Sequence, residues 1–258
     1  MEAEFIDLKR EGLIATIVLS RPEKLNRLDT GSMKRLVAVL QGLDVDPDIR
    51  VVVITGMGKA FCAGADIREF EESGVLAQRR QAETFRGLCL ALHRMRTPVV
   101  AKVNGIAIGG GMAMVSLAHL AVASREAQFG TPEINVGAFP SMVMSAILRS
   151  VPRKRALKMI LMGEMVGAEE ALEIGLVNAV VPPEELDRTT ASLAQRLASK
   201  SPSAMTLGLD SIRLSSDLPY PHALEYLQEV NTLIRNTEDF REGSKAFVEK
   251  RKPVWKGL

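Results

Sequence analysis

Cysteine and aromatic residues are scarce in this chain of 258 residues. Its two cysteines, Cys62 and Cys89, are too few for a disulfide framework, which indicates a reducing compartment. Eight Phe, two Tyr and one Trp offer few rings for stacking on bases, and a formal net charge of +2 gives no electrostatic footprint for nucleic acid. The composition therefore argues against both a nucleic-acid-binding protein and a disulfide-stabilised secreted domain.

Histidine is equally rare, and the three copies lack the spacing of metal ligands, so we predict no metal site (His93, His119, His222). The chain also has no GxxxxGK[ST] phosphate loop and no GxSxG nucleophile elbow. Two GxG pairs are followed by Phe61 and Met114 where a dinucleotide fingerprint requires a third glycine. Nucleotide-binding and serine-hydrolase mechanisms are therefore not indicated.

No segment has the pattern of a leader or a membrane span. The first seven residues lack the basic and apolar regions of a secretion signal and the Arg/Ser-rich composition of a transit peptide. Residues 99–123 are strongly apolar, but Lys102, Asn104, His119 and four glycines within them argue against a span. A buried strand, turn and helix fit this run better, and we expect a cytoplasmic protein.

The apolar pattern predicts an α/β fold with a substantial core followed by a helical region. Beta-branched runs predict strands at Leu13–Leu19, Arg50–Thr55, Val99–Val103 and Leu120–Ala123. Between them, helical spacing predicts helices at Thr30–Leu43, capped by Asp29 or Thr30, and at Val75–Met95. From about residue 152 the pattern is helical at 153–162, 168–174, 183–200, 202–216, 221–236 and 238–250, interrupted by Val177–Val181.

A triple glycine carries the clearest chemical signal. The apolar run Ile106–Ile108 leads into Gly109–Gly111, and Met112–His119 then has the pattern of a buried helix. Unpaired backbone N–H groups at such a helix start carry the positive end of the helix dipole and suit an oxygen that gains negative charge. Residues 61–66, Phe-Cys-Ala-Gly-Ala-Asp, form a second small-residue turn. Tight helix packing alone would explain these glycines equally well.

One carboxylate stands out as a candidate acid or base. Glu133 lies between Pro132 and Ile134, and apolar neighbours should raise its pKa toward the working range. The alternative is a solvated loop glutamate. Cys62, in the second turn, is interpreted as a small buried side chain rather than a reactive thiol.

Five motifs in order resemble the enoyl-CoA hydratase/isomerase (crotonase) family. They are residues 21–26 (RPEKLN), 60–67 (AFCAGADI), 98–111, 128–133 (QFGTPE) and 241–252. The resemblance implies a spiral of repeated β-β-α units over residues 1–195. It also implies a C-terminal helical region over 196–258 that builds trimers, usually paired into hexamers.

The resemblance also assigns roles to residues. It places an oxyanion site at the amides of Ala65 and Gly110, and a proton-shuttling group at Glu133. Asp66 is interpreted as a turn or helix cap that fixes the loop, and no cofactor is expected beyond the coenzyme A of the substrate. Coenzyme A should lie along the turns of its own subunit, at Lys24, Leu25, Ala63, Ala65, Asp66, Ile67, Arg68, Gly109 and Gly110. A neighbouring subunit should add contacts from Phe247 and Lys250. Arg68 and Lys250 could equally be solvated surface charges.

Two departures from the family pattern bear on the reaction. Hydratases carry a second glutamate two residues after the triple glycine, where this chain has Ala113, and residues 141–144 (SMVM) replace a glycine-rich stretch. Larger apolar side chains there should narrow and dry the pocket. One carboxylate suffices to move a double bond, so isomerisation is favoured over hydration. Decarboxylation, thioester hydrolysis, and acyl-CoA binding without turnover remain alternatives.

Overall fold

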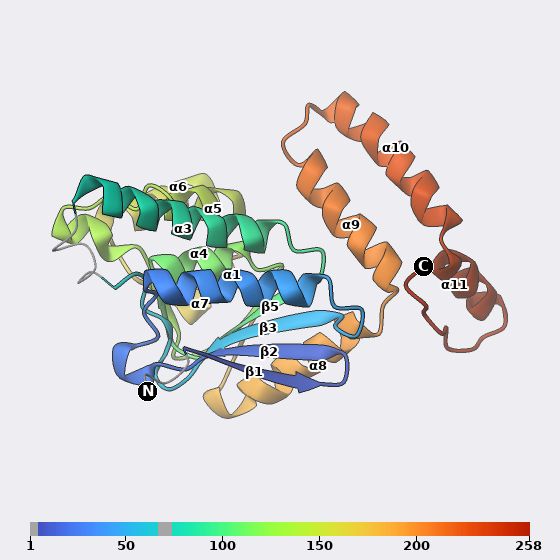
Figure 1. The fold of residues 1–258 in the computed structure, drawn as a ribbon, viewed down its shortest axis with the longest axis horizontal. Helices are drawn as coiled ribbons and strands as arrows, with labels where there is room; N and C mark the ends of the chain where they lie inside the picture. The colour runs from blue at the N-terminus through green and yellow to red at the C-terminus, as the bar shows by residue number, and fades with distance from the viewer. Residues whose placement is uncertain (1–4, 67–73) are drawn as a thin grey trace.

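The computed structural model describes residues 5–66 and 74–258, and it follows a repeated order of strand, strand and helix. Both strands of the first unit, β1 and β2, join a large sheet (Figure 1). In each of the next three pairs, β3–β4, β5–β6 and β7–β8, the first strand joins the large sheet and the second joins a small one. The large sheet has the order β1-β2-β3-β5-β7-β10, in which only the β1–β2 pair is antiparallel. Its strands are β1 (Ile6–Glu11), β2 (Ile14–Leu19), β3 (Val51–Gly56), β5 (Val99–Val103), β7 (Leu120–Ser124) and β10 (Ala179–Val181).

The small sheet has the order β4-β6-β8-β9, formed by β4 (Ala60–Cys62), β6 (Ile106–Ile108), β8 (Gln128–Gly130) and β9 (Val166–Gly167). Strands β4, β6 and β8 are parallel, whereas β9 is antiparallel to β8. Strands of two or three residues are too short to show an alternating pattern, which explains why the sequence analysis does not predict β4, β8 and β9. These short strands position the candidate site.

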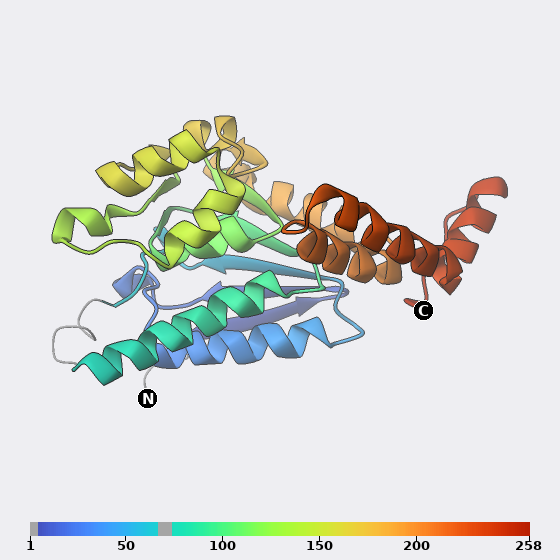
Figure 2. The ribbon, with the colours of Figure 1, turned by 90° about the horizontal axis from the view of Figure 1, so that it is seen from above.

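Helices α1 (Thr30–Asp44) and α3 (Val75–His93) lie side by side and cover the core on one side (Figure 2), and α4 (Gly110–Leu117) is buried within it. The start of α1 is fixed by a capping box, in which the Asp29 carboxylate accepts from the Ser32 N–H at 2.6 Å and Ser32 Oγ accepts from the Asp29 N–H at 2.9 Å. Helix α1 buries Met33, Leu36 and Leu40, a helical stripe that faces the sheet. The predicted N-cap and stripe of this helix are therefore confirmed.

The next segments complete the core. They are η1 (Pro22–Lys24), η2 (Pro132–Val136), α5 (Val143–Ser150), α6 (Arg153–Met162), α7 (Ala168–Glu173), η3 (Pro183–Glu185) and α8 (Leu186–Ala198). The single helix predicted for 183–200 is a 3-10 turn followed by α8, because Pro182 and Pro183 remove two backbone donors at its start. Ala194 and Ala198 of α8 pack on the outer face of the large sheet, against Val51, Val53 and Val100.

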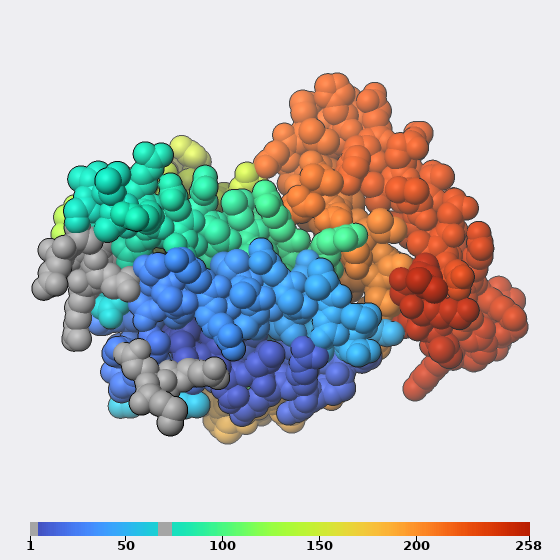
Figure 3. Space-filling model, in the orientation of Figure 1, coloured from blue at the N-terminus to red at the C-terminus, as the bar shows by residue number. Residues whose placement is uncertain are grey.

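The last three helices form an arm that leans away from both sheets (Figures 1 and 3). They are α9 (Pro202–Ser215), α10 (Tyr220–Asn236) and α11 (Glu238–Val248). Helix α8 spans residue 195, where the sequence analysis ends the core, so the arm begins after Ala198. Salt bridges from Arg96 to Asp210 (2.9 Å) and from Arg149 to Asp217 (3.0 Å) tie the arm to the core.

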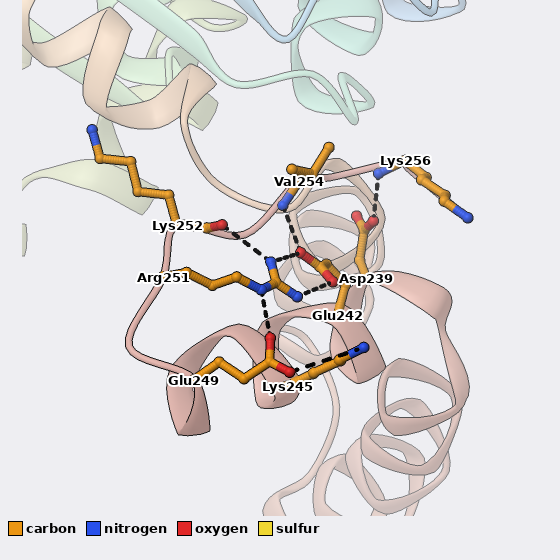
Figure 4. Close-up of polar contacts among 8 residues, drawn as sticks. All are labelled: Asp239, Glu242, Lys245, Glu249, Arg251, Lys252, Val254 and Lys256. Atoms are coloured by element: carbon orange, nitrogen blue, oxygen red, sulfur yellow. Dashed lines mark hydrogen bonds and ion pairs between the residues drawn. The ribbon is translucent and has the colours of Figure 1, made fainter.

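The chain end folds back over α11 and holds the arm together (Figure 4). Arg251 donates to both carboxylate oxygens of Glu242, at 2.6 and 2.9 Å, and to Glu249 at 2.6 Å. The buried carboxylate of Asp239 accepts from the Lys256 N–H at 2.8 Å and from Ser201 Oγ at 2.7 Å. The tail is therefore part of the folded arm.

Gly111 tests the packing of α4 on the small sheet. A Cβ at Gly111 would lie 2.1 Å from the Cys62 carbonyl oxygen, so we expect Gly111→Ala to lower the free energy of unfolding by about 1–3 kcal/mol or more. Gly87→Ala is the matched control, because a Cβ there meets nothing within 4 Å on α3 and alanine favours a helix by about 1 kcal/mol. Urea unfolding of both variants should show changes of opposite sign, and equal changes would contradict this packing.

Candidate active site

Three parallel strands of the small sheet end at one edge, and each is followed by one part of the candidate site. Residues 63–66 follow β4, the triple glycine follows β6, and Glu133 follows β8. The carboxyl ends of parallel strands lie side by side, which is where α/β proteins commonly place their ligands. Residues 65, 110 and 133 are far apart in sequence and reach one place for this reason.

The turn after β6 depends on Gly109, whose φ of 53° and ψ of −117° strain a residue with a side chain. Its N–H donates to the Gly130 carbonyl at 3.2 Å, and helix α4 begins at the next residue. The helix therefore starts two residues before the predicted Met112, because the glycines form its first turn. The Gly110 N–H is at the positive end of α4, where helical N–H groups lack intrahelical acceptors.

The turn after β4 packs directly on this glycine turn. Gly64 has a φ of 81°, and a Cβ on it would lie 3.1 Å from the Ile108 carbonyl oxygen and 3.5 Å from the Gly110 nitrogen. The backbones of the two turns therefore touch, with no room for a side chain between them. Ala65 and Gly110 are consequently brought together, as the resemblance implies.

A single parallel bridge orients Ala65. The Leu28 N–H donates to the Gly64 carbonyl at 2.8 Å, and the Asp66 N–H donates to the Leu28 carbonyl at 3.0 Å. In a parallel bridge the central residue directs its own N–H and C=O away from its partner strand. The Ala65 N–H therefore points away from Leu28.

Glu133 is a half-buried carboxylate on η2 that lies against the glycine turn. Its Oε1 is 2.8 Å from the place where a Cβ of Gly109 would be. Its Oε2 is buried and has no hydrogen-bond partner among the described residues. Burial raises the pKa of Glu133 above its ordinary value, and a backbone hydrogen bond offsets only part of this. A sheltered carboxyl group with a raised pKa is suited to act as a general acid or base.

The position of the missing hydratase glutamate is closed and apolar. Ala113 is 1% exposed on α4, between the buried side chains of Met112 and Met114. In the segment after Glu133, Val143 is buried and Met144 packs against the core, whereas Ser141 is exposed. Val143 and Met144 therefore pack against the core, and a narrowing of the pocket by this segment stays a prediction.

The turn expected to hold coenzyme A is built around Asn26. Leu25 and Asn26 have φ of 51° and 56°, and the buried Asn26 amide donates to the carbonyls of Met57 (3.0 Å) and Ala60 (2.7 Å). The Ala63 N–H donates to the Leu25 carbonyl at 3.0 Å. Lys24 is exposed beside this turn, and Leu25, Ala63, Ala65 and Asp66 are half-buried. The two proposed coenzyme A segments therefore form one surface.

Two of the other expected coenzyme A residues, Phe247 and Lys250, lie away from this surface (Figure 1). Ile67 and Arg68 fall outside the described residues. Phe247 is 85% exposed near the end of α11, and Lys250 follows it on the arm, at the end of the molecule away from η2 (Figures 1 and 2). Within one subunit these two residues do not join the site, so they could contact coenzyme A only on a neighbour.

Groups that could carry other chemistry do not converge on this site. Cys62 is fully buried and its thiol pKa is raised to about 12, so it packs as a small apolar residue. Within residues 5–66 and 74–258, no three His, Cys, Asp or Glu side chains are grouped as a metal site would require. His119 Nδ1 accepts from the Val99 N–H at 2.9 Å, a structural contact. No helix in the described part of the chain could cross a membrane.

Two residues at the site were missed by the sequence analysis. Leu28 Cδ1 lies 3.1 Å, and Phe85 Cε2 3.3 Å, from the place where a Cβ of Gly110 would be. The only signal for Leu28 is its position two residues after the RPEKLN motif. Phe85 is one of several residues on the inner side of α3, and no local pattern distinguishes it.

Known proteins share both this sequence pattern and this fold. The family model described as enoyl-CoA hydratase/isomerase matches residues 9–258. The (E)-benzylidenesuccinyl-CoA hydratase of Thauera aromatica is 36% identical over 98% of this chain and 99% of its own length. The short-chain-enoyl-CoA hydratase of Clostridium acetobutylicum is 34% identical, over 98% and 97% respectively.

Solved structures agree. An enoyl-CoA hydratase of Mycobacterium smegmatis superposes with a TM-score of 0.94 at 32% identity, covering 97% of this chain and 98% of the other. Human enoyl coenzyme A hydratase domain-containing protein 3 also gives 0.94, at 34% identity and with 97% and 100% coverage. The α/β spiral predicted from the motifs is thereby confirmed.

The raised pKa of Glu133 predicts how stability depends on pH. A folded-state pKa above the unfolded value contributes stability at low pH that is lost as pH rises through the folded pKa. We therefore expect Glu133→Gln to raise the free energy of unfolding at pH 7, with the gain disappearing below pH 4.5. Urea unfolding at both pH values measures this, with the exposed Glu229→Gln as control. A variant less stable than the parent at pH 7 would show that the charge is accommodated.

Proposed function

Because the chain belongs to the enoyl-CoA hydratase/isomerase family, we propose that it activates an acyl-CoA thioester at two backbone amides and moves a proton with Glu133 alone. The amides are those of Ala65 and Gly110, on the touching turns after β4 and β6. The observation that carries the proposal is Glu133 itself. A buried carboxylate oxygen that has no hydrogen-bond partner among the described residues has a lone pair free to accept a proton from a substrate carbon.

The proposed chemistry follows from where charge develops. When Glu133 removes a proton from the carbon beside the thioester, the electron pair moves to the thioester oxygen and forms an enolate. Two N–H groups in a site sheltered from water stabilise this oxygen, at about 3 kcal/mol for each donor. The protonated Glu133 can then return the proton to another carbon, which shifts the double bond.

Isomerisation is favoured over hydration because of Ala113. Hydration needs one carboxylate to hold and deprotonate water and another to deliver a proton, and position 113 offers only a methyl group. A single carboxylate can remove and return one proton without water. Decarboxylation and thioester hydrolysis use the same oxyanion site, and acyl-CoA binding without turnover is also consistent with Ala113.

The reaction as proposed needs no cofactor beyond the coenzyme A carried by the substrate. Two relatives are named as hydratases of a short-chain enoyl-CoA and of an aryl-substituted succinyl-CoA, so both acyl types belong in a substrate panel. Free Cys62 and Cys89 suit a reducing compartment, and we propose the cytoplasm. A relative in Dictyostelium discoideum is named as mitochondrial.

We also propose that the arm joins copies of this chain into a trimer or hexamer. Helix α10 has an apolar stripe at helical spacing, formed by Leu224, Leu227, Val230 and Ile234. Of these, Val230 is buried and Leu227 and Ile234 are half-buried, because α10 lies along α9. Most of this stripe therefore packs within the arm itself. Many large apolar side chains of the arm remain exposed, among them Leu224, Leu233, Phe240, Phe247, Val248 and Val254. Such clustered exposure on a protruding arm is typical of an interface.

Replacing Glu133 by Gln tests the catalytic proposal. Positioned acid–base groups contribute about 100- to 10,000-fold, so turnover of a 3-enoyl-CoA should fall by that order. Calorimetry with acetoacetyl-CoA should show that binding persists, since the turns that hold coenzyme A are untouched. An equally active variant would remove Glu133 from the mechanism, and a parent that binds no acyl-CoA at millimolar concentration would overturn the whole proposal.

The alanine at position 113 leads us to expect that isomerisation is faster than hydration. The parent should isomerise 3-hexenoyl-CoA faster than it hydrates crotonyl-CoA, and Ala113→Glu should raise hydration by supplying the second carboxylate. Ala113→Gln is the control, because it fills the same space without a proton-accepting group. Absorbance at the enoyl thioester band follows both reactions. Rapid hydration by the parent would show that another group holds the water.

Self-association predicts a solution mass of three or six times 28.1 kDa. Light scattering at micromolar concentration measures it directly. Phe247→Asp should lower the mass, because it places a charge on the exposed apolar face of the arm. Val45→Asp, equally exposed on the core, is the control and should leave the mass unchanged. A monomeric parent would refute both the assembly and the proposed roles of Phe247 and Lys250.

A further inference from the structure

Leu28 is in contact with both halves of the proposed oxyanion site. It lies between the Asn26 turn and Asp29, the N-cap of α1, and is 1% exposed. Its backbone pairs with one turn and its side chain packs on the other. It reaches the two turns through different parts of the same residue.

The backbone of Leu28 fixes the first turn. Its N–H and C=O hold the Gly64 carbonyl at 2.8 Å and the Asp66 N–H at 3.0 Å, on either side of Ala65. Two hydrogen bonds that flank one residue set the plane of its peptide. The direction of the Ala65 N–H therefore depends on where the Leu28 backbone lies.

The side chain of Leu28 fixes the second turn. Cδ1 lies 3.1 Å from the Cβ position of Gly110, so the methyl group occupies the space beside the first residue of α4. The Phe85 ring lies at 3.3 Å from the same point and supports that contact from α3. A close-packed methyl group restricts the position of the residue beside it, because protein interiors have little free volume into which the start of α4 could move.

We propose that Leu28 is a positioning residue that holds the Ala65 and Gly110 amides at the separation needed to bind one oxygen. The inference rests on the proposed function of this site. Leu28 acts through the two amides and needs no contact with substrate. Shortening its side chain should loosen Gly110 while leaving the backbone bonds to Gly64 and Asp66 in place.

The test compares Leu28→Ala, Leu28→Val and Leu28→Met with Leu40→Ala. Leu40 is also a fully buried leucine of the same core, and it lies on α1. Truncating its side chain creates a similar cavity away from the two turns. A displaced catalytic group typically costs about 100-fold in rate. For the isomerisation of 3-hexenoyl-CoA, kcat should therefore fall by about 10- to 100-fold in Leu28→Ala, with KM changed less than about threefold. Leu28→Met, nearly equal in volume, should keep kcat within about threefold.

Infrared spectroscopy gives a readout that a purely structural role would not move. The stretching frequency of a carbon-13-labelled thioester carbonyl in bound hexanoyl-CoA should be lowered by the parent, by Leu28→Met and by Leu40→Ala. It should return toward its value in water in Leu28→Ala and, to a smaller degree, in Leu28→Val. The valine variant keeps the test usable if the alanine variant does not fold.

Two results would overturn the inference while leaving the proposed function intact. One is an unchanged kcat and carbonyl frequency in Leu28→Ala or Leu28→Val. The other is an equal loss of kcat in Leu40→Ala, which would make the effect one of general stability. A parent that binds acyl-CoA without lowering the carbonyl frequency would instead refute the oxyanion site itself, and this inference with it.

Discussion

The close approach of two backbone turns is the constraint on which the candidate site depends. Gly64 and Gly109 meet where a single added carbon would contact main-chain atoms or the Glu133 carboxylate, and both have a positive φ. The pairing of strands β4 and β6 sets the distance between the two turns, and the bridge between Leu28 and Ala65 holds the first turn in place. Glu133 reaches the same point only because β8 pairs beside β6. Each of these contacts is short-range, but together they join three distant parts of the chain.

The glycine turn and the candidate acid–base glutamate are the parts of the site that the sequence predicts well. Consecutive glycines and a carboxylate between apolar residues are local signals, so the turn at Gly109 and the environment of Glu133 could be inferred before the structure was known. Helix α1 likewise has a long periodic stripe and a clear N-cap at Asp29. The short strands β4 and β8 carry no such pattern, since their conformation is imposed by pairing with neighbours.

Contacts made across the fold explain what sequence did not predict. Leu28 looks like any buried leucine, and its importance arises from an isolated bridge to a residue 37 positions away. The apolar stripe on α10 is visible in the sequence, but which of its residues a partner could reach depends on how α10 lies along α9. Ser141 follows an apolar loop and yet is exposed. In each case the residue type is known from the sequence, but its surroundings are decided by tertiary packing.

The backbone origin of the proposed oxyanion site has an evolutionary consequence. Every residue except proline has a main-chain N–H group, so the proposed activation of the substrate depends on the path of the backbone and on no particular side-chain donor. In the proposed mechanism, the side chains at positions 113 and 133 decide where the proton goes after activation. Lineages can therefore exchange one carboxylate for alanine and acquire a different reaction outcome while keeping the shared first step. Selection should accordingly be strict at Gly64 and Gly109 and permissive at Ala113.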